Sequence, residues 1–323
     1  MLLYGLEHLR SAGIKEVAIV LGPINEGVKA MVGDGSSLGL NVTYIQQPEP
    51  KGLAHAIQLS EHYLKGEPFV MYLGDNLLKQ GVLEFVETFN RRSLDCVIGV
   101  CPVRDPTRFG NVEVDGDKIT KIVEKPKEPK TNLALVGVYV FGPAIFDAVK
   151  EIKPSWRNEL EITDAIQLLV SQGKRVGVIR VSSWWKDTGR PEDLLEANQL
   201  VLSDLEPRIE VDVDQQVQLT GRVAIGKSSK LIGDVRIRGP AIIGERCEIG
   251  PNVYVGPYTS IGDECVLKNV EVENSIVMNG SRLECNKRIV DSIIGSYCTI
   301  LNGDKNLPRG YKVVLGERSF AQF

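Results

Sequence analysis

An aliphatic residue recurs every six residues through much of the second half of the chain. The nine positions in phase are Leu219, Ile225, Leu231, Ile237, Ile243, Ile249, Val255, Ile261 and Leu267. A glycine directly follows five of them: Ile225, Ile243, Ile249, Val255 and Ile261. Hexapeptide repeats of this kind build a parallel β-helix, in which one aliphatic side chain per short strand points inward and small residues turn the corners. The repeat therefore predicts a left-handed parallel β-helix over residues 206–323.

The six-residue phase drifts after Leu267 and is partly restored at Ile293, Ile294 and Ile300. This drift predicts one imperfect last coil, followed by an extended tail at residues 311–315. The flat flanks and the open end of a β-helix need cover. We therefore expect the β-helix to serve assembly into a homo-oligomer; an allosteric site is the alternative, although no basic pocket signature supports it.

The first part of the chain alternates between strand-like and helix-like segments. Apolar runs of strand length occur at residues 16–21, 41–45, 68–73 and 95–101, and segments with helical spacing lie at residues 25–31, 53–64 and 78–91. This alternation predicts an α/β domain with a parallel, doubly wound, Rossmann-like sheet. An amphipathic helix that stops at Gly13 opens the chain. The expected domains are residues 1–205 and 206–323, joined by a linker at residues 204–208 that contains Pro207.

Composition and charge exclude several classes of function. The net charge is -4 and no Lys/Arg tract occurs, so nucleic acid is not an expected partner. The longest apolar runs are far too short to cross a bilayer, and the opening residues have no basic leader, so neither a membrane protein nor a secreted one is expected. The 6 cysteines are scattered with no C-x-x-C pair, which indicates reduced thiols and a cytoplasmic protein.

Four clusters of polar residues follow predicted strands, where an open parallel sheet places its ligand. In the first, Gln47 precedes Gly52 across a loop with two prolines. A glutamine amide can pair with the edge of a base, and a glycine lets the backbone approach a flat ligand. The alternative is an ordinary strand-to-helix loop. The second cluster is Gly74-Asp75-Asn76, where an aspartate just past a strand suits Mg²⁺; the alternative is a common turn.

The third cluster is Glu124-Lys125-Pro126. If both charged residues lie on one strand, they point to opposite faces, so that one suits a sugar hydroxyl and the other a phosphate; a strand edge that ends at a proline is the alternative. In the fourth cluster, Asp187 follows two tryptophans and precedes Gly189. The alternative there is a packed aromatic turn in which the aspartate caps the next helix.

Together these clusters resemble the sugar-1-phosphate nucleotidylyltransferase family, and most closely its long-form glucose-1-phosphate thymidylyltransferases. The matching motifs run in order along nearly the whole chain: Gln47-x4-Gly52-Leu53-Ala54, Gly74-Asp75-Asn76, Phe109-Gly110, Glu124-Lys125-Pro126, Glu159-Leu160-Glu161-Ile162-Thr163-Asp164 and W-W-K-D-T-G-R-P-E-D-L-L-E-A-N at residues 184–198. This ordered series is far more specific than any one motif in it.

The resemblance implies Mg²⁺-dependent transfer of a nucleotidyl group from dTTP to glucose-1-phosphate, giving dTDP-glucose and pyrophosphate. In this reaction the protein positions two anions and neutralises charge. The resemblance also implies that Asp75 and Asp187 hold the Mg²⁺. UTP in place of dTTP, and another hexose-1-phosphate in place of glucose-1-phosphate, remain open, because thymine and uracil differ by a single methyl group.

The remaining roles also follow from the resemblance. Lys125 meets the sugar phosphate, and Glu124 binds sugar hydroxyls together with backbone at Gly110 and near Leu135. Gln47 and Gly52 recognise the pyrimidine.

One departure from the family concerns the start of the chain. Members of the family open with a strand and a glycine-rich loop that carries an arginine and, farther on, a lysine, and these grip the triphosphate. Residues 1–4 instead resemble the helix that follows that loop. About thirty family positions, including the central strand, are therefore expected to be missing from residues 1–323. A start that is set too late is the favoured explanation over a truncated protein, because a chain without its central strand would have a large core void. If residues 1–323 are the whole molecule, little or no transferase activity is expected.

Two other functions are kept open. One is a non-catalytic subunit that binds sugar nucleotides or serves assembly. The other is a bifunctional uridylyltransferase/acetyltransferase, whose acetyl transfer relies on a histidine base. The three histidines are His8, His55 and His62, all in the first domain, which argues against the second function. Packing within its helix is the expected role of His55.

Overall fold

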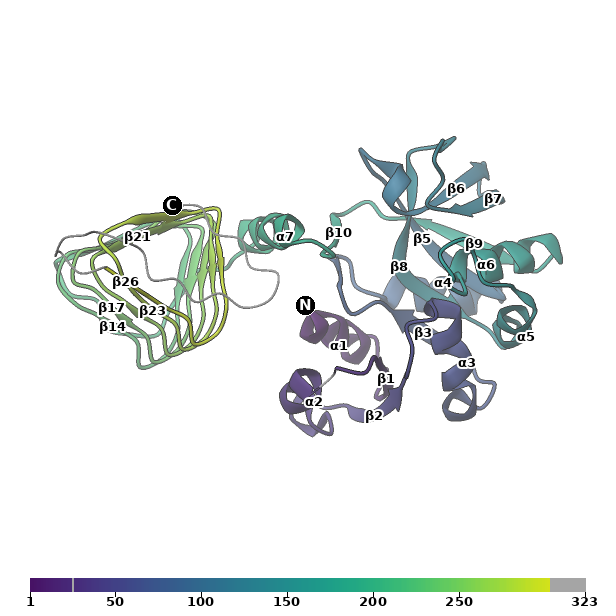
Figure 1. Cartoon of the computed structure of the whole chain (residues 1–323), viewed down its shortest axis with the longest axis horizontal. Coiled ribbons are helices and arrows are strands. Elements are labelled where there is room, and N and C mark those ends of the chain that lie inside the picture. The colour runs from purple at the N-terminus through teal and green to yellow at the C-terminus, as the bar shows by residue number, and fades with distance from the viewer. Residues whose placement is uncertain (25, 303–323) are drawn as a thin grey trace, which may run out of the picture. The chain divides into compact units, whose positions relative to one another are not determined.

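The structure, a computed structural model, describes residues 1–24 and 26–302. The chain forms two compact units, Met1–Asp187 and Thr188–Phe323, and Figure 1 labels their elements. The tail predicted at residues 311–315 lies outside the described residues. No helix of the described residues is both long enough and apolar enough to cross a membrane.

The first unit alternates helices and strands, as the sequence predicts. Its helices are α1 Leu2–Ser11, α2 Glu26–Val32, α3 Leu53–Leu64, α4 Leu83–Arg92, α5 Ala144–Glu151 and α6 Ile162–Ser171, with short 3₁₀ turns η1 Ser36–Leu38 and η2 Pro106–Arg108. Its strands are β1 Glu16–Leu21, β2 Asn41–Gln46, β3 Phe69–Tyr72, β4 Asn76–Leu78, β5 Cys96–Pro102, β6 Gly110–Asp115, β7 Lys118–Glu124, β8 Leu133–Phe141, β9 Val176–Arg180 and β10 Trp185–Asp187.

The main sheet of this unit is mixed, so the expectation of an all-parallel sheet is wrong. Its strand order is β7-β6-β8-β5-β9, and β3 also pairs with β8. Strands β5 and β9 are parallel, whereas β8 runs antiparallel to β3, β5 and β6. The sequence of β8, L-A-L-V-G-V-Y-V-F, is apolar throughout and almost wholly buried. A strand buried on both faces has no alternating pattern, and this strand was not among those predicted.

Helices cover both faces of the sheet, which is the predicted doubly wound arrangement. Along β8, Leu135, Tyr139 and Phe141 join the core cluster that contains α3, α5 and α6. The alternate residues of β8, Val136, Val138 and Val140, join the cluster that contains α1 and α4. This division follows from the two-residue period of a strand.

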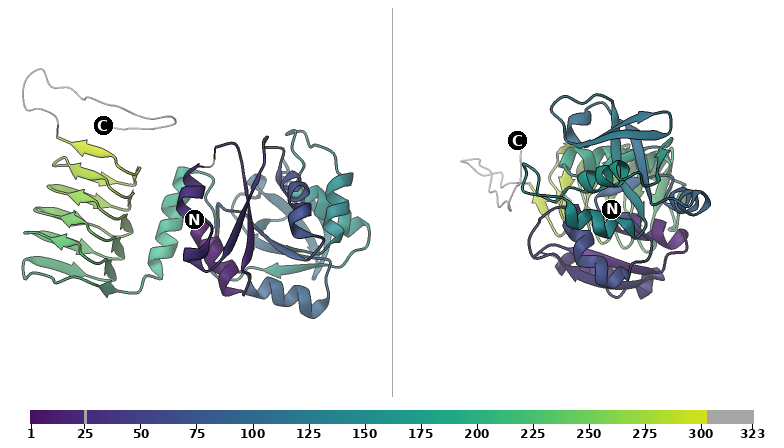
Figure 2. Two further views of the ribbon diagram at one scale, coloured as in Figure 1. Left: turned by 90° about the horizontal axis from the view of Figure 1, so that it is seen from below. Right: turned by 90° about the vertical axis from the view of Figure 1, so that its right-hand side faces the viewer.

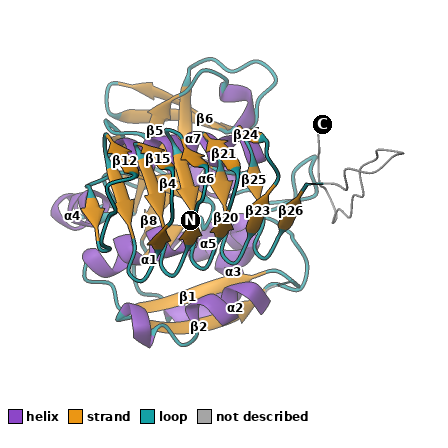
Figure 3. Cartoon of the chain, turned by 90° about the vertical axis from the view of Figure 1, so that its left-hand side faces the viewer, coloured by secondary structure: helices purple, strands orange, loops and turns teal. Residues whose placement is uncertain are grey.

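Strands β1 and β2 form a separate parallel pair, shown side by side in Figure 3. The predicted opening helix is α1, and Gly13 beyond its end has a φ of 80°. The predicted helix at residues 78–91 begins later, at Leu83, because residues 76–78 form β4.

The second unit consists of a helix and a parallel β-helix, whose coils stack regularly in Figure 2. The helix is α7 Pro191–Ser203. The first of its three parallel sheets contains β11 Arg208–Ile209, β13 Val223–Ile225, β16 Ala241–Ile243, β19 Thr259–Ile261, β22 Ile276–Val277 and β25 Ile293–Ile294. The second contains β12 Val217–Thr220, β15 Val235–Arg238, β18 Val253–Val255, β21 Val270–Glu273 and β24 Arg288–Val290. The third contains β14 Lys230–Leu231, β17 Glu248–Ile249, β20 Val266–Leu267, β23 Arg282–Glu284 and β26 Thr299–Leu301.

The predicted inward positions form the core of the β-helix. All nine belong to one hydrophobic cluster, in which Leu219 and Leu231 are partly buried and the other seven are buried. The prediction of one imperfect last coil is wrong, because the parallel pairing continues regularly after Leu267. Val277 pairs with Ile261 and Leu283 with Leu267. These partners are fewer than eighteen residues apart, so shorter corners break the six-residue phase while the inward positions remain.

Helix α7 belongs to the second unit, although the sequence places it before the predicted boundary at 205/206. The side chain of Asn198 donates to the carbonyl of Tyr258 at 2.9 Å and accepts from the Ser260 hydroxyl at 2.6 Å. Gln199 donates to Asn274 at 2.8 Å. These hydrogen bonds fasten the helix to the coils, and the compact units accordingly divide between Asp187 and Thr188.

Candidate active site

Pairing between two short strands brings Asp75 and Asp187 together. Strand β10 runs antiparallel to β4, with Asp187 directly opposite Asn76. Asp75 is the residue before Asn76, in the turn that follows β3. The two aspartates are 112 positions apart in sequence (187 minus 75), yet their backbones are neighbours at one end of the paired strands.

The Asn76 side chain holds this region in place. Its amide nitrogen donates to Asp75 Oδ1 at 2.9 Å. Its oxygen accepts from Trp185 Nε1 at 2.7 Å and from the backbone N–H of Gly137 at 3.2 Å. Asn76 is 1% exposed, so these groups satisfy one another away from water. Asn76 is part of a motif recognised in the sequence, but no role was predicted for it.

Gly137 in β8 makes this network possible, because the absence of a side chain there lets the Asn76 amide lie close to the β8 backbone. A Cβ at this position would lie 2.6 Å from Cγ of Asn76. Any side chain here would therefore displace the Asn76 amide.

Gln47 lies in the loop between β2 and α3, and hydrogen bonds to neighbouring residues orient its side-chain amide. The amide nitrogen donates to the carbonyl of Gly52 at 3.2 Å and lies 3.1 Å from Nδ1 of His55. With the nitrogen used in this way, the Gln47 oxygen remains as the acceptor for a ligand. His55 thus has a partner in the predicted site, beyond the packing role expected for it.

Gly52 begins α3 in a conformation that favours glycine, with a φ of 96°. A Cβ here would lie 2.5 Å from the carbonyl oxygen of Leu160. The neighbouring backbone is bonded to the same residue, because Ala54 N–H donates to the Leu160 carbonyl at 3.1 Å and Leu160 N–H donates to Lys51 at 2.8 Å. The loop that carries Gln47 and Gly52 is thereby attached to the Glu159–Asp164 motif.

Gly110, Glu124 and Leu135 also come together. Gly110 in β6 is paired with Glu124 at the end of β7. A Cβ at Gly110 would lie 3.3 Å from Oε2 of Glu124, 3.3 Å from Cβ of Leu135 and 2.7 Å from Cγ2 of Thr163. The absence of a side chain at Gly110 leaves its backbone accessible beside the Glu124 carboxylate.

Lys125 is not on a strand with Glu124, so the two residues do not alternate between faces as predicted. Strand β7 ends at Glu124, and Lys125 has a φ of 40° in the left-handed region. The turn, rather than the pleat of a strand, sets the direction of the lysine. A proline at position 126 follows and stops the strand.

Arg157 lies beside Glu124, although it was not among the residues predicted for the site. Its guanidinium lies 3.7 Å from Glu124, 2.9 Å from Glu159 and 3.4 Å from Glu161. The signal available in the sequence is its position two residues before the Glu159–Asp164 motif. Since arginine binds carboxylates and phosphates, its place here adds a second cation, besides Lys125, that acts on Glu124.

The pKa of Glu124 is raised above the ordinary value for glutamate. Burial is the largest cause, and the nearby charge of Glu161 adds to it, while Lys125, Thr163 and Arg157 act in the opposite direction. A buried carboxyl with a shifted pKa is common at functional sites.

An aromatic contact joins the residues around Asp75 and Asp187 to the residues around Gly110 and Glu124. The rings of Phe109 and Trp185 meet edge to face, with centroids 5.2 Å apart. Phe109 immediately precedes Gly110, and Trp185 lies two residues before Asp187 on the same face of β10. The Asp75–Asp187 group and the Gly110–Glu124 group are therefore linked by a direct ring contact within the first unit.

The residues at Asp75 and Asp187 fit a magnesium ion. Mg²⁺ prefers oxygen ligands and is usually held by one or two carboxylates together with substrate phosphates. Two carboxylates on adjoining backbone segments, one of them oriented by Asn76, provide such a donor set.

Comparison with known proteins now defines the class of this protein. Residues 1–204 match the nucleotidyl transferase family model, and residues 231–317 match the GMPPB C-terminal domain. The chain belongs to the nucleotidyl transferase family.

Two curated relatives extend the likeness along the whole chain. The low-salt glycan biosynthesis nucleotidyltransferase Agl11 of Haloferax volcanii is 44% identical over 318 residues, which are 98% of this chain and 89% of the relative. A glucose-1-phosphate thymidylyltransferase of Streptomyces antibioticus is 44% identical over 322 residues, 99% of this chain and 89% of the relative. The chain is thus a sugar-1-phosphate nucleotidyltransferase, as the resemblance in its motifs predicts.

A solved structure is similar as well. It is a Bacillus anthracis protein provisionally identified as a glucose-1-phosphate thymidylyltransferase, in complex with sucrose. The TM-score is 0.59 at 32% identity, covering 66% of this chain and 85% of that one.

Proposed function

We propose that this protein transfers a thymidylyl group from dTTP to glucose-1-phosphate, producing dTDP-glucose and pyrophosphate. The observation that carries the proposal is the β4–β10 pairing, which sets Asp75 beside Asp187 in a unit of the nucleotidyl transferase family. The thymidylyltransferase of Streptomyces antibioticus supports the choice of substrates.

In this proposal the nucleotide lies against Gln47 and Gly52. The oxygen of Gln47 accepts from the imide N–H of thymine, since its nitrogen already donates to Gly52. The backbone of Gly52 lies close to the flat base because no side chain intervenes.

The sugar phosphate lies at the other group of residues. The Glu124 carboxylate accepts hydrogen bonds from sugar hydroxyls, and the backbone at Gly110 and near Leu135 contributes further contacts. Lys125 and Arg157 neutralise the phosphate. Held in this way, the phosphate oxygen faces the α-phosphorus that it attacks, and positioning supplies much of the rate enhancement.

Asp75 and Asp187 would hold the Mg²⁺ ion. When bound, the ion neutralises charge on the phosphates as pyrophosphate leaves. The chain orients these carboxylates through the hydrogen bond from Asn76 and through the pairing of β10 with β4.

The test is formation of sugar nucleotide from dTTP, glucose-1-phosphate and Mg²⁺. We expect Asp75→Asn and Asp187→Asn each to lower kcat/KM by roughly 100-fold or more, because an electrostatic partner of the transition state is lost. Asp117→Asn, an exposed aspartate in the turn between β6 and β7, is the matched control and should leave the rate unchanged.

A separate binding measurement distinguishes the rival function. Calorimetric titration of dTTP with and without Mg²⁺ should show metal-dependent binding that Asp187→Asn weakens. Metal-dependent binding with no sugar nucleotide formed would favour the non-catalytic subunit instead. Binding of dTTP that is equally tight with and without Mg²⁺ would contradict the proposed roles of Asp75 and Asp187 in holding the ion.

The choice of thymidine over uridine is tested by competition between dTTP and UTP. A single methyl group in an apolar pocket changes the transition-state energy by about 1–3 kcal/mol, which corresponds to roughly a 10- to 200-fold preference. Equal kcat/KM values for the two nucleotides would reject thymidine specificity and leave the general transferase reaction intact.

A further inference from the structure

The side-chain amide of Gln47 directs its nitrogen at two partners within the protein. Nε2 donates to the carbonyl oxygen of Gly52 at 3.2 Å and lies 3.1 Å from Nδ1 of His55. A carbonyl oxygen only accepts, so the end of the amide that faces Gly52 must be the NH₂ group. A ligand beside Gln47 therefore meets the oxygen end of the amide.

The same contact defines the hydrogen-bonding role of the His55 ring. Because the amide nitrogen of Gln47 is a donor, Nδ1 of His55 accepts, and the single ring hydrogen of a neutral imidazole then lies on Nε2. His55 is the third residue of α3, and the start of this helix is fixed to Leu160, whose carbonyl accepts from the N–H of Ala54 at 3.1 Å. The acceptor that faces Gln47 is thus carried by an anchored part of the fold.

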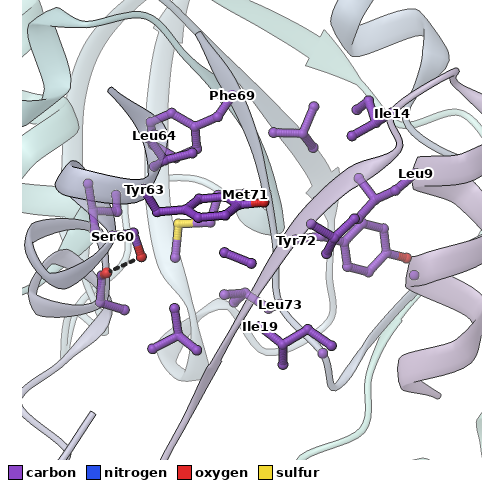
Figure 4. Close-up of a pocket in the computed structure, with 18 of the residues that line it drawn as sticks. Leu9, Ile14, Ile19, Ser60, Tyr63, Leu64, Phe69, Met71, Tyr72 and Leu73 are labelled. Carbon is purple, nitrogen blue, oxygen red and sulfur yellow. Dashed lines mark hydrogen bonds between the residues drawn. The ribbon is translucent and has the colours of Figure 1, made fainter. Parts of the chain in front are cut away.

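Gln47 lines a large cavity of the first unit, part of which Figure 4 shows. The cavity has a volume of about 1310 Å³, and Asp75 belongs to its lining as well. Tyr63 of α3 and Leu73, which follows β3, are among the lining side chains that Figure 4 labels. His55 is not among the described residues that line this cavity. The imidazole therefore acts on a ligand in the cavity through the amide of Gln47.

The oxygen end of an amide distinguishes between classes of pyrimidine. Thymine and uracil carry a hydrogen on N3, and this imide N–H can donate to the oxygen. Cytosine has a lone pair at N3, so the same oxygen would face another acceptor. A site whose polar groups meet the wrong partner discriminates strongly, because the groups are left unpaired. An amide turned over, with its N–H toward the base, would suit cytosine instead.

We propose that His55 is the positioning residue that keeps the oxygen of Gln47 directed at the base, so that the site accepts thymine or uracil and rejects cytosine. The inference rests on the proposed function, in which Gln47 meets the pyrimidine, and adds the residue that decides the class of base. Turning the amide over would place its oxygen against two acceptors, the Gly52 carbonyl and Nδ1 of His55. Without the imidazole, only the Gly52 carbonyl opposes that turn.

Two substitutions of similar size test this role. His55→Asn keeps an acceptor, because the amide oxygen of asparagine lies as many bonds from the backbone as Nδ1 of histidine, whereas His55→Leu has none. Calorimetric titration in the presence of Mg²⁺ measures the Kd of dTTP, dUTP and dCTP for each protein. We expect the wild type to bind dTTP at least about tenfold more tightly than dCTP. His55→Leu should lower this preference by roughly three- to tenfold, and His55→Asn should keep it within about twofold of the wild type.

Two further comparisons separate positioning from general damage to the fold. dUTP presents the same imide N–H as dTTP, so the ratio of the dTTP and dUTP Kd values should stay the same in every His55 variant. In a Gln47→Ala background, His55→Leu should not lower the preference for dTTP over dCTP any further, because the amide through which His55 acts is gone.

Three results would overturn the role of His55. They are a preference for dTTP over dCTP that His55→Leu leaves unchanged, equal losses in His55→Leu and His55→Asn, and a wild type that binds dTTP no more tightly than dCTP. The Kd ratios are measured without sugar phosphate or turnover. Normal formation of sugar nucleotide with an unchanged ratio in His55→Leu would therefore reject only this inference. The expected ratios with no product formed would reject only the transferase reaction.

Discussion

Asn76 shows how one side chain can organise a site without a predicted role of its own. Its three hydrogen bonds reach Asp75, the β10 residue Trp185 and the central strand at Gly137. Buried polar groups are costly when unpaired. The orientation of the Asp75 carboxylate therefore depends on the packing of the tryptophan two residues before Asp187.

Replacing this amide should destabilise the first unit. Asn76→Ala leaves the N–H groups of Trp185 and Gly137 without their acceptor, so we expect the free energy of unfolding to fall by roughly 2–4 kcal/mol. Urea denaturation measures the change. The exposed Asn132→Ala is the control and should change the free energy by less than about 0.5 kcal/mol. Similar losses in both variants would contradict the network.

The raised pKa of Glu124 predicts a pH dependence of stability. Because the folded chain holds this proton more tightly than the unfolded chain, the free energy of unfolding falls as pH rises from the ordinary glutamate pKa of 4.5 through the raised pKa. Glu124→Gln lacks this titration. The stability difference between the variant and the wild type should thus move in favour of the variant across that window, by about 1.4 kcal/mol for each pH unit between the two pKa values.

Urea denaturation at a series of pH values spanning roughly 4 to 8 measures this difference. The exposed Glu128→Gln controls for removal of one negative charge, and its effect should stay below about 0.5 kcal/mol at each pH. A difference for Glu124→Gln that does not change with pH would mean that its pKa is not raised by folding.

At the scale of elements, the loop between β2 and α3 is positioned by a segment more than a hundred residues later. Gly52 packs directly against the backbone of Leu160, and two backbone hydrogen bonds join the segments. The β2–α3 loop carries Gln47, and the Leu160 segment leads to Glu161 and α6. The loop that carries Gln47 and the residues around Glu124 thus share one support.

Gly52→Ala tests this junction. The added Cβ would meet the Leu160 carbonyl at 2.5 Å, and the backbone has a positive φ, so we expect a loss of roughly 2–4 kcal/mol in the free energy of unfolding. Gly66→Ala is the matched control, since Gly66 has a φ of 75° with nothing within 4 Å. It should lose only about 1 kcal/mol from backbone strain. Equal losses would mean that strain alone, and not the contact with Leu160, matters at Gly52.

At the scale of the whole molecule, each unit has its own hydrophobic core. Ile249 is 0% exposed in the core of the β-helix, and Ile98 is 0% exposed in the sheet of the first unit. Domains with separate cores commonly unfold in separate transitions. We therefore expect two transitions in scanning calorimetry.

Matched substitutions should assign the two transitions. Ile98→Ala and Ile249→Ala should each cost about 2–5 kcal/mol and lower the temperature of only one transition, a different one in each case. Ile232→Ala, at a position 42% exposed, should shift neither transition by more than about 2 °C. A single transition lowered equally by both core variants would show that the units unfold together.

The repeat of the β-helix was predictable because its six-residue period is visible in the sequence without knowledge of the fold. Inward residues must be apolar and recur once per short strand, so nine of them were identified from the sequence. The boundaries of β1 and α3 were predictable for a similar local reason, since turns and glycines flank them. Local rules failed for β8, because a strand buried on both faces has no alternation, and for the last coils, because shorter corners break the period without moving the inward side chains.

The candidate site also has features that the sequence predicted and features that only the tertiary structure decided. The residue types and their order along the chain indicated Asp75, Asp187, Gln47, Gly52, Gly110, Glu124, Lys125 and Leu135 as candidates, because motif chemistry is written in short segments. Their grouping was decided by long-range pairing: β10 with β4, β6 with β7, and Gly52 with Leu160. The contacts of Arg157 and Asn76 depend on which backbone segments and side chains meet in space. Contacts between distant segments arise from packing of the whole chain and leave no local pattern in the sequence.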